Sequence, residues 1–290
     1  MKNYSDKIWN WGIMLLLAFI WGSSFILMKR GLEVFSYIQV ADMRMGLAWL
    51  SLLPFIWNKI KKTPKKLWIP LAIVGLFGNG IPAFLFTKAQ TQLDSSLTGI
   101  LNSLVPLFTL IIAVIIFKTK VKSHNILGII IGLIGAIWLV AGNGVIMDNA
   151  QYAWFVIGAT ICYAISLNTI KNYLQELSPI HIAGIAFFFI GPPTLIHLLY
   201  TDFLNIMITE KNAWEAFGYI LLLAIIGTSL AVIIFNKLVH KTTAIFASSV
   251  TYLIPIFAIM WGLIDGEEIA LQHFLGTGII FAGIYLVNKQ

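Results

Sequence analysis

The sequence has little charge and almost no cysteine. Only 11% of its 290 residues are charged, whereas 59% are hydrophobic, and a soluble globular domain of this size could not bury so much apolar side chain. The single cysteine, Cys162, has no second thiol with which to form an intrachain disulfide or to share a metal ion. These shortages exclude an ordinary soluble domain and indicate one membrane-embedded unit.

Several sequence motifs of energy-coupled proteins and enzymes are also missing. The chain has no G-x-x-x-x-G-K-[ST] phosphate loop, no H-E-x-x-H metal motif and no G-x-S-x-G nucleophile elbow, so we expect neither ATP-driven transport nor a catalytic or metal cofactor. No carboxylate lies clearly in the middle of an apolar run, which gives no obvious proton-coupling group; Asp42 and Glu267 are the remaining candidates. The sequence predicts neither an enzyme nor a cofactor-dependent protein.

The apolar runs are long enough to cross a lipid bilayer. A transmembrane helix needs about 20 apolar residues, and the runs between charge clusters predict ten such helices. The first run lacks an A-x-A cleavage site before Lys29 and Arg30, so we interpret it as a retained helix rather than a signal peptide. The predicted helices begin near Trp9, Tyr37, Leu67, Ser95, Asn125, Gln151, Pro179, Trp214, Thr243 and Leu271.

The basic residues are distributed unevenly between the two sides of the predicted bundle. With a cytoplasmic N-terminus, 14 of the 19 Lys and Arg residues fall in cytoplasmic segments and four in outer segments, while Arg44 lies inside a span. This asymmetry satisfies the positive-inside rule when both termini are cytoplasmic. The net charge of +7 therefore indicates membrane topology rather than nucleic-acid binding, and we predict a multi-pass protein of a bacterial inner membrane. The cytoplasmic group is Lys2, Lys7, Lys59, Lys61, Lys62, Lys65, Lys66, Lys118, Lys120, Lys122, Lys171, Lys237, Lys241 and Lys289; the outer group is Lys29, Arg30, Lys88 and Lys211.

The two halves of the chain resemble each other. An offset of 142 residues places Lys29 on Lys171, and an offset of 149 places Pro106 on Pro255. These and other matches occur in the same order in both halves, which favours a five-helix repeat over residues 1–145 and 146–290. Because five is odd, the second repeat enters the membrane from the opposite side, as in many secondary transporters. The predicted fold is an all-α membrane protein of ten transmembrane helices in two inverted five-helix repeats.

Glycine-rich segments lie at corresponding places in the two halves. The 149-residue offset places Gly78-Asn79-Gly80 on Gly227-Thr228-Ser229. Such segments indicate either irregular backbone that lines a cavity or close helix packing through small residues. For the polar and aromatic residues of the spans, the alternatives to a cavity are interhelical hydrogen bonds and core packing. Our candidate cavity residues are Trp21, Ser24, Arg44, Asn79, Asn102, Tyr163, Asn168, Thr228, Asn236, Ser248 and Tyr252.

Arg44 is the one Lys or Arg well inside a predicted span. A fixed charge there is costly, so it should bind a substrate carboxylate, form a structural ion pair or extend towards the interface. Asp42 is two residues away on a helix and thus points to a different face, which disfavours that particular pair.

Several short motifs resemble those of the EamA-like family within the drug/metabolite transporter superfamily. The segment from Ala18 to Phe25 is similar to the family's A-x-x-W-G-x-x-F, and Arg44 with Ala48 is similar to R-x-x-x-A. The family's repeated L-x-P-x-F is matched around Pro106 and Pro255. Gly266-Glu267 resembles its G-E ending, although Lys118 stands where the first half would often carry the corresponding Glu.

This resemblance implies a central cavity between helices one to four and six to nine, with helices five and ten at the periphery. It also implies transport of amino acids and related metabolites, frequently their export. We therefore predict a secondary transporter that alternates access to a small organic substrate. A membrane-embedded enzyme, a channel and a carrier of phosphorylated metabolites or nucleotide sugars remain alternatives. Gly128 and Gly132 could support either a homodimer or close packing within one chain.

Overall fold

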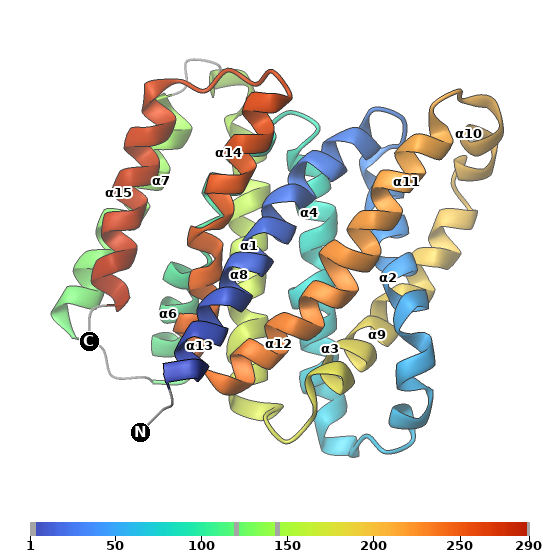
Figure 1. Cartoon of the computed structure of the whole chain (residues 1–290), viewed down its shortest axis with the longest axis horizontal. Helices are drawn as coiled ribbons and strands as arrows, with labels where there is room; N and C mark the ends of the chain where they lie inside the picture. The colour runs from blue at the N-terminus through green and yellow to red at the C-terminus, as the bar shows by residue number, and fades with distance from the viewer. Residues whose placement is uncertain (1–3, 119–121, 143–145, 289–290) are drawn as a thin grey trace.

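The computed structural model describes residues 4–118, 122–142 and 146–288, and within these ranges the chain is helical with no β-strand (Figure 1). The α-helices are α1 (Tyr4–Leu32), α2 (Tyr37–Ile60), α3 (Trp68–Gly75), α4 (Ile81–Ala89), α5 (Ser95–Asn102), α6 (Val105–Ile115), α7 (Ser123–Gly142), α8 (Ile146–Tyr173), α9 (Pro179–Leu199), α10 (Phe203–Thr209), α11 (Ala213–Ala224), α12 (Ala231–Lys241), α13 (Ala244–Ser248), α14 (Ile254–Ile264) and α15 (Leu271–Asn288). This confirms the all-helical class predicted from the sequence.

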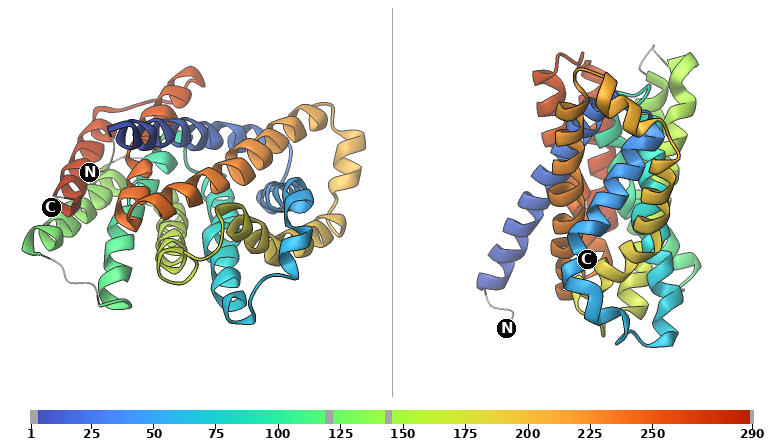
Figure 2. Two further views of the ribbon diagram at one scale, coloured as in Figure 1. Left: turned by 60° about the horizontal axis from the view of Figure 1, so that its bottom comes forward. Right: turned by 90° about the vertical axis from the view of Figure 1, so that its right-hand side faces the viewer.

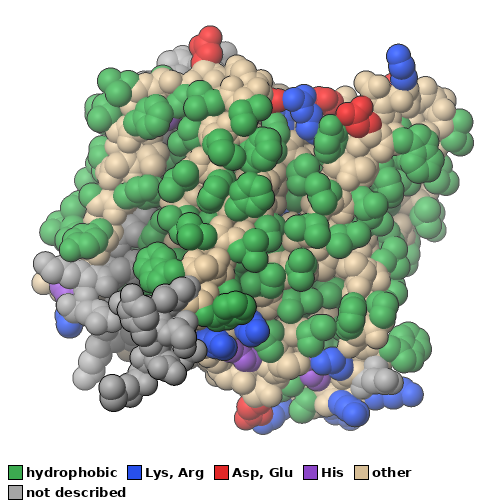
Figure 3. Space-filling view, viewed as in Figure 1, with side chains coloured by type: hydrophobic (Ala, Val, Ile, Leu, Met, Phe, Trp, Pro, Cys, Tyr) green, Lys and Arg blue, Asp and Glu red, His purple; other side chains and the backbone are tan. Residues whose placement is uncertain are grey.

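Among the described residues, seven helical segments are long and apolar enough to cross a membrane: Trp9–Leu32, Lys65–Ala89, Ser95–Ile115, Gln151–Tyr173, Pro179–Leu199, Ala213–Lys241 and Phe246–Ile264. The other three predicted spans correspond to α2, α7 and α15. Within α7 and α15, the apolar segments Ser123–Gly135 and His273–Gly283 are shorter, and α2 carries Asp42 and Arg44. Hydrophobic side chains cover the middle of the surface, and charged ones gather at its two ends (Figure 3).

Four of the predicted spans are interrupted rather than continuous. The first π segment (Leu76–Gly80) separates α3 from α4, and the second π segment (Ile225–Leu230) separates α11 from α12. The segments Ser95–Ile115 and Phe246–Ile264 are also divided, because α5 ends before α6 and α13 ends before α14. Both α6 and α14 have a proline at one of their first two positions. Proline has no N–H to donate and therefore favours the start of a new helix. The sequence predicted glycine-dependent irregularity only in the first two of these spans.

The helices pack as a main bundle with one pair at its side. In the main bundle, α2 packs along α9, α8 contacts α4 and α6, and α1 contacts α11 and α14. At one edge, α7 and α15 lie side by side (Figures 1 and 2). A Cβ added to Gly283 would lie 2.4 Å from the Gly132 nitrogen and 2.6 Å from the Gly128 oxygen. These glycines therefore allow close backbone approach within one chain.

Candidate substrate cavity

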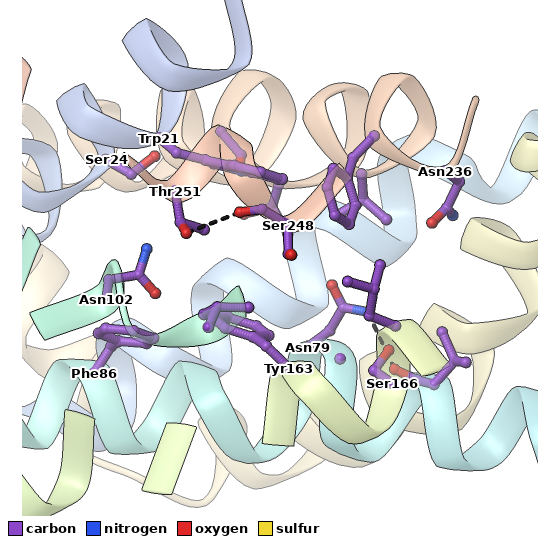
Figure 4. A pocket seen from close by; sticks show the side chains of 18 of the residues that line it. Trp21, Ser24, Asn79, Phe86, Asn102, Tyr163, Ser166, Asn236, Ser248 and Thr251 are labelled. Carbon is purple, nitrogen blue, oxygen red and sulfur yellow. Dashed lines mark hydrogen bonds between the residues drawn. The ribbon is translucent and has the colours of Figure 1, made fainter. Parts of the chain in front are cut away.

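A cavity of about 110 Å³ lies inside the main bundle. In the same measure of volume, one water molecule needs about 10–15 Å³. The cavity therefore has room for a small organic molecule. Its polar and aromatic side chains come from both halves of the chain and face a common space (Figure 4). Of the eleven candidate residues, the structure places nine in the lining: Trp21, Ser24, Arg44, Asn79, Asn102, Tyr163, Thr228, Asn236 and Ser248.

Two of the eleven candidate residues, Asn168 and Tyr252, lie outside this lining. The Asn168 amide donates hydrogen bonds to the carbonyls of Thr109 (3.0 Å) and Ala164 (2.9 Å), so it ties α8 to α6. The ring of Tyr252 lies 6.4 Å from that of Phe281 on α15. Sequence spacing could not distinguish contacts of this kind from the lining of a cavity.

The two π segments have the same internal hydrogen bond. In the first, the Asn79 side chain donates to the carbonyl of Val74 over 3.4 Å; in the second, the Thr228 hydroxyl donates to the carbonyl of Leu223 over 3.0 Å. Each bond spans five residues, and both the donors and the acceptors are related by the 149-residue offset. A polar side chain thus supports the irregular backbone at the same place in each half, and π-bulges are frequent at functional sites.

Aromatic side chains form two equivalent pairs along the cavity. Trp21 and Phe235 pack edge to face with ring centroids 5.1 Å apart, and Tyr163 and Phe86 stack at 5.8 Å. The 142-residue offset relates Trp21 to Tyr163, and the 149-residue offset relates Phe86 to Phe235. Sequence reasoning missed Phe86 and Phe235 as lining residues, although their matching positions in the two halves were the signal that could have identified them.

A second matched contact places serine against glycine. A Cβ added to Gly78 would lie 2.3 Å from Ser166 Oγ, and one added to Gly227 would lie 2.8 Å from Ser24 Oγ. The two serines are related by the 142-residue offset and the two glycines by the 149-residue offset. The structure therefore combines the two interpretations of the glycine-rich segments, because the irregular backbone lines the cavity and also packs closely against a neighbouring helix.

Arg44 is buried in the cavity wall, with 8% of its surface exposed. Its Nε donates to Thr228 Oγ1 over 2.9 Å, and its guanidinium also interacts with the Tyr163 hydroxyl. In the described parts of the chain, no carboxylate forms an ion pair with Arg44. Asp42 instead contacts His197, so the expected separation of Asp42 and Arg44 onto different faces is present. Among the described residues that line the cavity, Arg44 is also the one that carries a charge.

A carboxylate joins three elements near one end of the cavity. Glu267 accepts hydrogen bonds from the main-chain N–H groups of Ser95 (3.0 Å) and Ser96 (3.1 Å), and it forms an ion pair with Lys29 (3.0 Å). Burial alone would raise the pKa of Glu267, but the Ser96 side-chain and main-chain hydrogen bonds, the Lys29 ammonium and the Ser95 amide hold that pKa below its usual value. The Gly-Glu pair seen in the sequence therefore has a structural role at the start of α5.

Comparison with known proteins gives the decisive observation. Residues 9–141 and again residues 151–289 match the EamA-like transporter family. The chain belongs to the EamA-like transporter family. This family membership makes it a multi-pass membrane transporter of the drug/metabolite type.

Relatives of this EamA-like transporter match it along nearly their whole length. A transporter of Archaeoglobus fulgidus is 23% identical over 97% of this chain and 99% of its own. The inner membrane transporter YedA of Escherichia coli K12 is 26% identical over 96% of this chain and 90% of its own. An S-adenosylmethionine/S-adenosylhomocysteine transporter of Chlamydia trachomatis serovar L2 is 24% identical over 96% and 88%.

The fold of this EamA-like transporter also resembles a solved structure. A protein crystal structure superposes on this chain with a TM-score of 0.65 over 95% of each chain, at 13% sequence identity. At this identity the likeness shows the fold alone. Within the described ranges, no three His, Cys, Asp or Glu residues gather as a group that could hold a metal ion.

Proposed function

We propose that the chain is a secondary carrier that exports amino acids or related small metabolites across a bacterial inner membrane by alternating access, without ATP. The observation that carries the proposal is the cavity between the two halves, whose walls repeat the same aromatic pair and the same serine–glycine contact. In an inverted-repeat carrier, matched walls of this kind allow either side of the site to open in turn.

The proposed topology has ten transmembrane helices in two inverted repeats, residues 1–145 and 146–290. The two family matches, over residues 9–141 and 151–289, support this division. The described start of α1 and the end of α15 lie towards the same end of the bundle (Figure 1). Together with the excess of basic residues in the segments on that side, this supports cytoplasmic N- and C-termini.

The proposed substrate has a carboxylate and an apolar or aromatic part. A buried arginine without an acidic partner favours an anionic group, because an uncompensated buried charge is costly. Trp21, Phe86, Tyr163 and Phe235 offer aromatic surface for the remainder of the molecule. A carrier of phosphorylated compounds would have several inward cations, whereas the lining has Arg44 alone. The chlamydial relative named for S-adenosylmethionine, a compound derived from an amino acid, also supports this class.

The proposal is tested with purified protein in sealed proteoliposomes. We expect saturable uptake of labelled amino acids or related carboxylates that is accelerated by unlabelled substrate on the opposite side. Conductance without such counterflow would support a channel, and chemical conversion of the substrate by detergent-solubilised protein would support an enzyme. Either result would contradict the carrier assignment.

Arg44 provides the residue-level test. Arg44→Ala should weaken transport of a carboxylate substrate by about 10- to 100-fold, since a hydrogen bond to a charged group contributes about 1.5–3 kcal/mol. The methyl ester of the same compound should lose far less. Lys237→Ala, which removes an exposed cation of α12, is the matched control and should transport normally. Equal transport of the free carboxylate by Arg44→Ala and the control would remove the proposed role of Arg44.

A further inference from the structure

Asp42 is a buried acid inside an otherwise apolar part of the protein. The seven apolar spans and α2 together contain two acidic residues, Asp42 and Glu215. Glu215 is exposed in the first turn of α11 and accepts a hydrogen bond from Tyr219, whereas only 1% of the Asp42 side chain is exposed. Acidic groups buried at membrane depth are costly and commonly mark ion or proton pathways.

The Asp42 carboxylate has one titratable partner and one oxygen without any partner. Its Oδ2 lies 2.6 Å from Nδ1 of His197 on α9, and its Oδ1 is buried with no hydrogen-bond partner. The His197 side chain is 55% exposed near the end of α9. The exposed imidazole gives a route by which a proton can reach the buried acid.

Among the described side chains of the elements around α2, the other charged groups have partners other than Asp42. On α4, Lys88 lies over the ring of Tyr37, with its Nζ 4.4 Å from the ring centroid. On α1, Lys29 and Arg30 form ion pairs with Asp265, Glu267 and Glu33. Glu215 on α11 contacts Tyr219, and Arg44 on α2 itself contacts Thr228. His197 is the charged group that acts on Asp42 in the described chain.

We infer that Asp42 and His197 form a proton-binding site whose occupancy is linked to transport. The inference rests on the proposed carrier function, because a proton bound at this site lets such a carrier use a proton gradient. While the Asp42 carboxylate is charged, its buried Oδ1 has no hydrogen-bond partner among the described residues. A proton on the carboxylate removes this buried charge. The cost of burying the charge therefore favours proton uptake.

The link to the cavity runs through α2. The Asp42–His197 contact joins α2 to α9. Two residues later, on the opposite side of α2, Arg44 donates a hydrogen bond to Thr228 in the second π segment. Close packing holds α2 on α9, since a Cβ added to Gly46 would lie 2.3 Å from Leu195 Cδ2. A change in the charge of the Asp42–His197 pair thus acts on the helix that carries the proposed carboxylate contact, and substrate and proton can each alter the affinity for the other.

The first test measures proton binding without transport. Infrared difference spectra of the detergent-purified full chain are recorded on acidification. In addition to the bands of the other acidic residues, we expect one further protonated-carboxyl C=O band in the unaltered protein and in Glu215→Gln, and we expect that one band to be missing from Asp42→Asn. In His197→Gln, which keeps Asp42, the same band should appear at a different pH. The absence of the band in the unaltered protein, or its persistence in Asp42→Asn, overturns the inference.

The second test separates proton linkage from transport itself. For coupling of one proton to one substrate, a pH difference of one unit should sustain a substrate concentration ratio of about tenfold across the proteoliposome membrane. Asp42→Asn should retain counterflow at equal pH yet sustain no ratio above one, while Glu215→Gln should behave as the unaltered protein. If the unaltered protein shows no counterflow, the proposed function fails. If counterflow is present but the pH gradient sustains no substrate concentration ratio above one, the proton site is contradicted and the proposed carrier function is not. The same conclusion follows if Asp42→Asn still sustains a substrate ratio under the pH gradient.

Discussion

Ser96 donates a hydrogen bond of 2.6 Å to Glu267 Oε2, although 171 residues separate the two in the sequence. With Lys29, this contact joins α1, the start of α5 and the segment after α14. The corresponding position in the first half holds Lys118, and Lys171, which corresponds to Lys29, donates to the carbonyls of Val239 and Thr242. The carboxylate network therefore has no acidic counterpart at the equivalent position of the other half.

The Glu267 network should make stability depend on pH. The folded protein holds the pKa of Glu267 below its usual value, which is about 4.3 in an unfolded chain. The network therefore stabilises the fold above about pH 4.3, and that stabilisation is lost as the pH falls through the lowered value. Glu267→Gln should reduce the free energy of unfolding at neutral pH by about 3 kcal/mol. On acidification, the free energy of unfolding of this variant should fall by less than that of the unaltered protein. Thermal unfolding in detergent from neutral to acidic pH measures both effects.

Glu268→Gln is the matched control, because Glu268 is the exposed neighbour of Glu267. It should follow the pH profile of the unaltered protein. Identical profiles for the two variants would show that Glu267 does not stabilise the fold in its ionised form.

The close contact at Gly78 should make alanine unfavourable there. A Cβ at this position would lie 2.3 Å from Ser166 Oγ and 3.1 Å from Ser166 Cβ. We expect Gly78→Ala to lower the free energy of unfolding by about 1–3 kcal/mol, because the added methyl group overpacks the contact. The shift of the unfolding midpoint in detergent measures this effect. Gly218→Ala places its Cβ in open space on α11 and should instead stabilise the protein by about 0.5–1 kcal/mol. A shift of the same sign in both variants would contradict the packing account.

The matched aromatic pairs should contribute equally to substrate binding. Phe235→Leu and Phe86→Leu each remove one ring that packs against Trp21 or Tyr163. We expect each variant to raise the KM for an aromatic substrate by about two- to tenfold, because an aromatic pair contributes about 0.5–1.5 kcal/mol. Phe274→Leu alters an exposed ring on α15 and should leave KM unchanged. A large effect in one half with none in the other would show that the two walls are not functionally equivalent.

Much of the helical architecture could be predicted from the sequence, because apolar length and charge clusters are strong local signals. The matched glycine-rich segments also indicated where the backbone is irregular. The breaks before Pro106 and Pro255 were not predicted, since a proline near the start of a helix and a proline within a continuous span give similar apolar runs.

The candidate site was only partly accessible to sequence reasoning. Arg44 was identifiable because a cation within an apolar span is costly. The Asp42–His197 contact was not, because 155 residues separate its members and no local pattern brings them together. Asn168 illustrates the opposite case, since a polar amide fits a cavity wall but this one donates to the Thr109 carbonyl of α6 and to the Ala164 carbonyl of its own helix.

The most direct measurement of the central claim is the reactivity of one cavity cysteine from each side of the membrane. Thr251 lines the cavity, so Thr251→Cys in a Cys162→Ala background gives a single thiol for a membrane-impermeant reagent. Alternating access predicts reaction from both sides, with substrate raising the rate on one side as it lowers the rate on the other, and no reaction of Cys162→Ala alone. Reaction from one side only under every substrate condition, or simultaneous access accompanied by ion conductance, would contradict the account.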